Sequence, residues 1–153
     1  MAGLLVHQHD AYLREMAGYF AGLHLPQAAV PATPVAADLL ARGALLAYYG
    51  DPARRLPACS TCHGPTLGGT PPAVPGLLGL PRDYLIAQLG AWQTGQRHAT
   101  APDCMADIAR RLGPDDASAV AGWLAAQPVP AGLAAGLAGS GPASTGPWPA
   151  TGR

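Results

Sequence analysis

The sequence predicts an all-α fold. Five segments have the apolar spacing or the capping residues of helices, and no segment alternates apolar and polar residues as a strand would. Glycine and proline are abundant, at 20 and 17 of 153 residues, but much of this content lies in one internal loop and in the C-terminal tail. A chain of this length supports one domain of ordinary size with terminal extensions.

The first predicted helix covers residues 10–23, and Asp10 is a suitable N-cap. Its apolar residues recur at helical spacing: Leu13, Met16, Ala17, Phe20 and Leu23. Residues 24–37 contain three prolines and predict an extended connection. We therefore expect an N-terminal helical segment at 1–25 and a Pro/Ala linker at 26–37.

The second predicted helix covers residues 38–49 and is followed by a turn with the sequence CSTCH at 59–63. Residues 64–81 are too rich in proline and glycine for regular structure, so they predict a loop. A third helix is predicted at 82–93. Its apolar residues share one face: Leu85, Leu89 and Trp92.

Two shorter patterns complete the predicted domain. A helix near 103–112 has Asp103 as its candidate cap, and a last helix runs from Pro114 to about Gln127. Proline suits the first helical turn, and the two aspartates that follow it are favourable at the positive end of the helix dipole. We expect the compact domain at 38–127, and a disordered Gly/Ala/Pro tail at 128–153.

The charge pattern excludes several classes of protein. Nine basic residues, all arginine, balance nine acidic ones, so there is no basic face for nucleic acid. No apolar run approaches the roughly 20 residues that a transmembrane helix needs. The first residues lack the positive region and the cleavage site of a secretory signal.

The CSTCH motif allows three chemistries: a disulfide, half of a zinc site, or covalent attachment of haem c. A zinc site needs four ligands, and the candidates to complete one with Cys59 and Cys62 are Cys104 and His98. The haem interpretation uses every residue of the motif, because two thiols at this spacing can add to the porphyrin vinyl groups and His63 then follows as the proximal ligand. We favour haem, with zinc and disulfide as the alternatives.

Met105 is the candidate for the sixth position on the iron. It lies on the predicted short helix in phase with three apolar residues: Ile108, Ala109 and Leu112. Taken alone, Met105 is a core residue, but downstream of CxxCH in an all-α domain it becomes a candidate ligand. His98 is a competitor in an expected exposed loop, and we expect Cys104 to be a small buried residue.

With CSTCHG, the Pro/Gly loop and Met105 in place, residues 38–127 resemble the class I c-type cytochromes, closest to the diheme cytochrome c4 and cytochrome c553-like group. The resemblance implies about four helices around one haem c. It also implies that the carbonyl of Pro75 orients His63 and that Arg97 pairs with a haem propionate. Gly43 would let the last helix cross closely, and Trp123 would pack between helices.

The N-terminal segment resembles the closing helix of a preceding cytochrome module, although no CxxCH precedes it. Haem attachment to this motif takes place outside the cytoplasm, so the resemblance implies a periplasmic or otherwise extracytoplasmic protein. We therefore hypothesise that the chain is the C-terminal part of a longer precursor that carries two haems. The alternative is that residues 10–23 form an accessory amphipathic helix.

The function that follows is one-electron transfer between redox partner proteins, with no catalytic residues. One alternative is a haem subunit of a larger dehydrogenase or oxidase complex. Another is a five-coordinate haem sensor or enzyme, if Met105 does not bind the iron.

Overall fold

The computed structural model describes residues 2–21, 34–71 and 73–129. It divides into two compact units, an N-terminal unit that includes residues 1–27 and a larger unit at residues 28–129. The predicted linker and C-terminal tail lie mostly outside the described residues. Within the described ranges, no helix is both long and apolar enough to cross a membrane.

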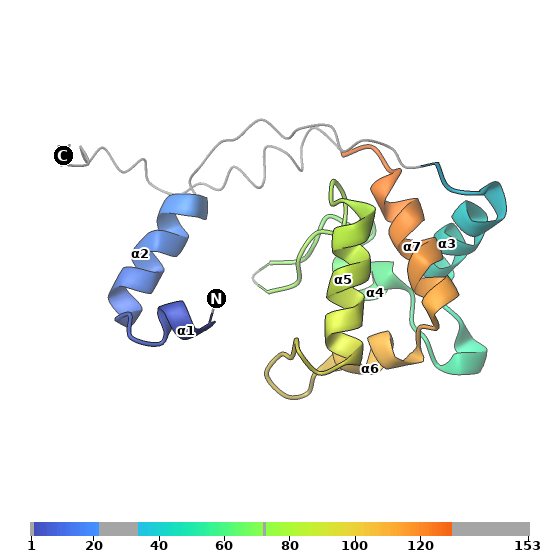
Figure 1. Cartoon of the computed structure of the whole chain (residues 1–153). Coiled ribbons are helices and arrows are strands. Elements are labelled where there is room, and N and C mark those ends of the chain that lie inside the picture. Colours follow the sequence, from blue (N-terminus) through green and yellow to red (C-terminus); the bar gives the residue numbers. More distant parts are fainter. Residues whose placement is uncertain (1, 22–33, 72, 130–153) are drawn as a thin grey trace. The chain divides into compact units, whose positions relative to one another are not determined.

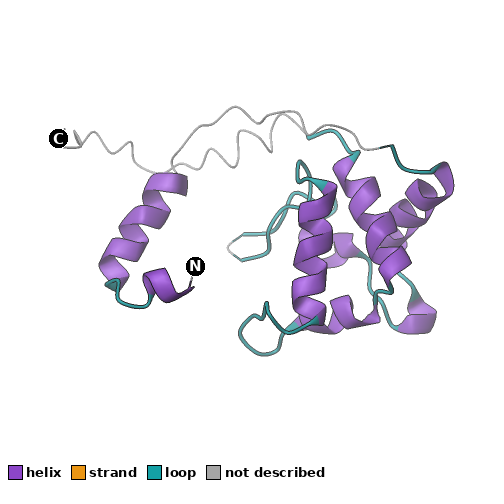
Figure 2. Cartoon of the chain, in the orientation of Figure 1, coloured by secondary structure: helices purple, strands orange, loops and turns teal. Residues whose placement is uncertain are grey.

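The all-α prediction is confirmed, because no strand occurs within the described ranges (Figure 2). The N-terminal unit contains two helices, α1 (Ala2–Leu5) and α2 (Asp10–Ala21). Figure 1 shows the elements of the larger unit. They are α3 (Ala37–Tyr49), the 3₁₀ turn η1 (Pro52–Arg54), α4 (Cys59–His63), α5 (Arg82–Gln93), α6 (Cys104–Arg111) and α7 (Pro114–Ala125).

The five predicted helices are all present, and their ends differ from the prediction by two residues at most where the chain is described. Three short elements of the described chain lie outside the five predicted helices. The sequence predicts only a turn at α4, and it predicts neither α1 nor η1. The predicted cap of the first helix is wrong in detail, because α2 begins at Asp10 itself. The acidic side chain therefore stands in the first turn, where the dipole still favours it.

The larger unit is organised around the crossing of α3 and α7. Gly43 of α3 is buried, and a Cβ at this position would lie 2.6 Å from the Cβ of Trp123 on α7. The absence of a side chain at Gly43 lets the two backbones approach, as the sequence predicted. Trp123 also stacks edge-on against Tyr48, with ring centres 5.4 Å apart.

The core continues from this crossing to α5 and to the segments that flank α4. All its members are less than a tenth exposed. They are Leu46, Ala47, Leu56, Leu67, Leu85, Leu112, Val120, Ala121 and Leu124. The loop residues Leu56 and Leu67 stand on either side of CSTCH, so both ends of the motif are fastened to the core.

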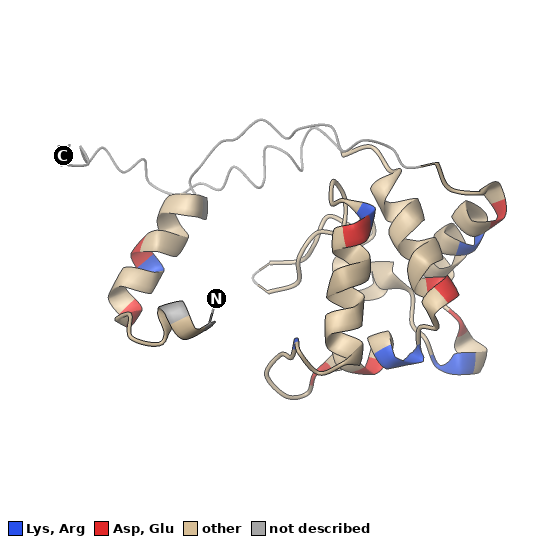
Figure 3. Cartoon of the chain, viewed as in Figure 1, with Lys and Arg blue, Asp and Glu red and all other residues tan. Residues whose placement is uncertain are grey.

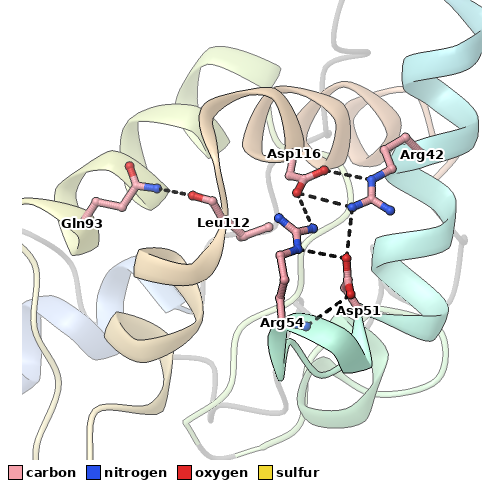
Figure 4. Close-up of polar contacts among 6 residues, drawn as sticks. All are labelled: Arg42, Asp51, Arg54, Gln93, Leu112 and Asp116. Atoms are coloured by element: carbon pink, nitrogen blue, oxygen red, sulfur yellow. Dashed lines mark hydrogen bonds and ion pairs between the residues drawn. The ribbon is translucent and has the colours of Figure 1, made fainter.

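An ion-pair network joins α3, η1 and α7 next to that crossing. Asp116 accepts from Arg42 at 2.9 Å and pairs with Arg54 at 2.5 Å, and Asp51 contacts both arginines (Figure 4). The hydrogen bond from Arg42 is the largest cause that lowers the pKa of Asp116, and the bond from Arg54 adds to it. This network fixes the segment that leads into α4.

Replacing Gly43 by alanine should destabilise the protein by about 2–3 kcal/mol, because the new methyl group must push α3 and α7 apart. Urea unfolding followed by circular dichroism measures this. Gly90→Ala is the matched control, since Gly90 also lies inside a helix and a Cβ there meets nothing within 4 Å. An equal loss in both variants would contradict the close crossing.

Asp116→Asn should cost about 1–2 kcal/mol at neutral pH by weakening its charged hydrogen bonds. Because the folded-state pKa of Asp116 lies below its usual value of 3.8, its contribution is present above that pH and is lost as the pH falls through the folded pKa. The variant should therefore lose less stability on acidification than the parent. The exposed neighbour Asp115→Asn is the control for net charge.

Candidate functional site

The helix α4 presents the CSTCH motif in a single turn. Cys59 and Cys62 are three residues apart, so their side chains lie on neighbouring positions of one helix face. Both are free thiols; Cys59 is half-buried and Cys62 is exposed. Burial raises the pKa of the Cys59 thiol to about 11, so this thiol is protonated at neutral pH.

His63 closes the motif and is 6% exposed. Its Nδ1 lies 2.7 Å from the carbonyl oxygen of Pro75. Since a carbonyl can only accept, Nδ1 must carry the proton that it donates, and Nε2 keeps a free lone pair. The imidazole is therefore held in the tautomer and orientation that suit a metal ligand through Nε2.

The loop between α4 and α5 is folded so that Pro75 reaches His63. Gly69 N donates to His63 O at 2.8 Å, and Leu77 N donates to Leu67 O at 2.9 Å. Gly69 has a φ of 93°, and a Cβ there would lie 2.6 Å from Gly76 N. The irregular loop predicted from its composition is thus a compact turn, and its glycines allow the two halves to touch.

Met105 stands on α6 and is half-buried. The residues in phase with it pack as predicted: Ala109 is fully buried, Leu112 is 6% exposed, and Ile108 is half-buried against the core. The predicted cap of this helix is confirmed, because Asp103 Oδ1 accepts from Ala106 N at 3.0 Å. The apolar face of α6 therefore carries the thioether toward the interior of the unit.

Two residues compete with Met105 as candidate ligands: His98 lies in the loop before α6, and Cys104 is the first residue of α6. His98 is exposed, as expected. The expectation that Cys104 is buried is wrong: it is exposed, with its Sγ 3.7 Å from Pro102 O, because the first residue of α6 points toward the exposed loop that precedes it. Among the described residues, no three His, Cys, Asp or Glu side chains gather as a metal site, so the zinc alternative gains no support.

Arg97 lies in the exposed loop after α5. Its guanidinium carbon stands 4.3 Å from the centre of the Trp92 ring, and its Nη1 donates to Gln88 Oε1. Trp92 Nε1 is buried and makes no hydrogen bond of ordinary geometry, but it lies close enough to the Asp103 carboxylate to help the backbone N–H of Ala99 lower the pKa of that group. The sequence identified Trp92 only as part of an apolar face, and nothing in the spacing indicated that its N–H would lie near Asp103.

The donors and the apolar surface around them fit a haem. An imidazole with Nε2 free and a thioether are typical ligands of haem iron. Half-buried apolar side chains from five segments also pack against the core. They are Cys59 from α4, Leu77, Leu78 and Leu80 from the loop, Ile86 and Leu89 from α5, Ile108 from α6 and Trp123 from α7.

No protein-family model matches the sequence. The thiosulfate dehydrogenase electron acceptor of Thiomonas intermedia strain K12 is 34% identical over 129 residues, which are 84% of this chain and 58% of that protein. The chain thus spans little more than half the length of this relative.

Two solved structures share the fold. The first is the thiosulfate dehydrogenase TsdBA from Marichromatium purpuratum in its as-isolated form, with a TM-score of 0.68 and 37% identity over 78% of this chain and 25% of that one. The second is reduced recombinant cytochrome c4 from Pseudomonas stutzeri, with a TM-score of 0.66 and 28% identity over 82% of this chain and 64% of that one.

Proposed function

This chain belongs to the class I c-type cytochromes of the cytochrome c4 group, and from that membership we propose that it carries single electrons on one covalently bound haem c outside the cytoplasm. The observation that carries the proposal is the hydrogen bond from His63 Nδ1 to Pro75 O, which leaves Nε2 as a ligand. When bound, haem c supplies an iron that gains and loses one electron.

Cys59 and Cys62 are the attachment residues in this proposal. Each thiol would hold the porphyrin through a thioether bond formed by addition of its S–H across one vinyl group, which needs no oxidant. The placement of both side chains on one turn supports this assignment. The half-buried position of Cys59 beside the core keeps its thioether close to the apolar residues that would cover the macrocycle.

His63 and Met105 are the proposed axial ligands. The buried imidazole is oriented by Pro75, and the thioether is carried on the inward face of α6. A thioether favours the ferrous state and raises the reduction potential. Ligation by both residues would leave no position on the iron for a substrate, as a simple electron carrier requires. Arg97 is proposed to pair with a haem propionate.

Expression with export and haem maturation should give one haem per chain in a pyridine haemochrome assay. In Cys59→Ser, one vinyl group stays unsaturated and the reduced α-band should move to longer wavelength. Cys104→Ser is the control and should keep the parent spectrum, because Cys104 lies outside the motif. A chain that retains no haem after denaturation would refute the covalent attachment.

Met105→Ala should change the ferric protein from low-spin to high-spin and abolish the weak long-wavelength band that marks a methionine–iron bond. Its reduction potential should fall, because ferrous iron loses the thioether. Absorption spectroscopy and potentiometric titration measure both. A parent protein that is already high-spin would instead favour the five-coordinate sensor or enzyme.

A second function, as the electron acceptor of a dehydrogenase, is favoured by the likeness to a thiosulfate dehydrogenase electron acceptor and to part of TsdBA. The loop between α4 and α5 carries no charged residue, and residues 38–127 balance seven arginines with seven aspartates (Figure 3). Such a surface suits docking through apolar contact with weak steering. Stoichiometric co-purification with a dehydrogenase would separate this function from that of a free carrier.

A further inference from the structure

The helix that carries Met105 has little stability of its own. It spans eight residues, and an isolated helix of that length does not persist in water. Its buried residues are Ala106 and Ala109, together with Leu112 at its C-cap, and Met105 stands next to Ala106 in the first turn. Since alanine buries little apolar surface, the polar contacts at the two ends of α6 must contribute to holding that turn in place.

At the N-terminal end of α6, the Asp103 carboxylate accepts two hydrogen bonds from backbone N–H groups. Oδ1 accepts from Ala106 N at 3.0 Å and caps α6, and Oδ2 accepts from Ala99 N at 2.8 Å across the preceding loop. Residues 94–101 of this loop are all exposed, and the loop borders a hollow of about 440 Å³ instead of packing on the core. Figure 1 shows it projecting beyond α5 and α6. Asp103 therefore ties a loop with little packing to the start of the helix.

At the C-terminal end, one side chain of α5 holds the last turn. Gln93 Nε2 donates to Leu112 O (Figure 4) and to Ala109 O, each at 2.9 Å, and so uses both hydrogens of its amide. Ala109 O also accepts from Leu112 N at 3.2 Å, so the amide adds a second bond at this end of the helix. Gln93 thus fixes α6 against α5 in rotation and along its axis.

We infer that Asp103 and Gln93 are positioning residues that clamp α6 at both ends and thereby keep Met105 on the iron. The inference rests on the proposed axial ligation. A helix released at either end opens locally at a lower free energy than the whole domain unfolds, and such an opening would take Met105 away from the iron. Neither side chain is proposed to touch the haem, so each acts through Met105.

Imidazole is the probe, because it competes with Met105 for ferric iron and its apparent affinity rises as the methionine is held less tightly. The full-length haem-loaded protein is titrated and followed by absorption. Asp103→Ala and Gln93→Ala should each bind imidazole about fivefold more tightly than the parent, from the loss of a cap or of two amide bonds. Met105→Ala gives the limit of complete methionine loss.

Asp107→Asn is the matched control. Asp107 lies on the same helix and carries the same charge as Asp103, but it pairs only with the exposed Arg110 and Arg111, at 3.4 and 3.3 Å. It should bind imidazole within about twofold of the parent. If one of the two clamp variants does not fold, the imidazole affinity of the other variant tests the proposal.

Three results would overturn the clamp: parent-like affinity in the clamp variants that fold, an equal gain in Asp107→Asn, or a gain that persists in the Met105→Ala background. Failure of the proposed ligation is recognised separately. In that case the parent itself binds imidazole as tightly as Met105→Ala does, whatever stands at positions 93 and 103.

Discussion

The hydrogen bond between His63 and Pro75 is the constraint on which the site depends. Twelve residues separate the partners, and the chain between them must turn back on itself to bring a carbonyl oxygen 2.7 Å from Nδ1. The turn requires glycine where its halves touch, as at Gly69. The composition that makes this segment look unstructured is therefore what allows it to hold the imidazole.

The remainder of the larger unit supplies a frame for that loop. The crossing of α3 and α7 at Gly43 forms the apolar centre, and the network around Asp116 ties η1 to both helices. Because η1 ends only a few residues before α4, the helix crossing and the ion-pair network together fix where the CSTCH motif begins. The loop and α5 then complete the surroundings of His63.

The fold was largely predictable, since helical spacing, Pro114 and the Asp103 cap are local signals that tertiary contacts did not override. The motif and Met105 were also visible in the sequence, and their roles stay proposals. The contacts of Gln93 could not be predicted, because its partners are backbone carbonyls 16 and 19 residues away that carry no sequence signal. The predicted burial of Cys104 is wrong because it rested on the usual burial of cysteine. At the start of a helix, this cysteine faces an exposed loop instead.

The exposure of Cys104 has a practical consequence. The sequence holds three cysteines, and the proposed haem attachment would use two of them, which would leave Cys104 as the thiol that reagents can reach on this domain. That thiol adjoins the proposed methionine ligand in sequence. A spin label or a gold surface coupled there would approach the molecule from one defined side. Cys104 thus offers an attachment point for oriented electrochemistry, next to the methionine that is proposed to bind the iron.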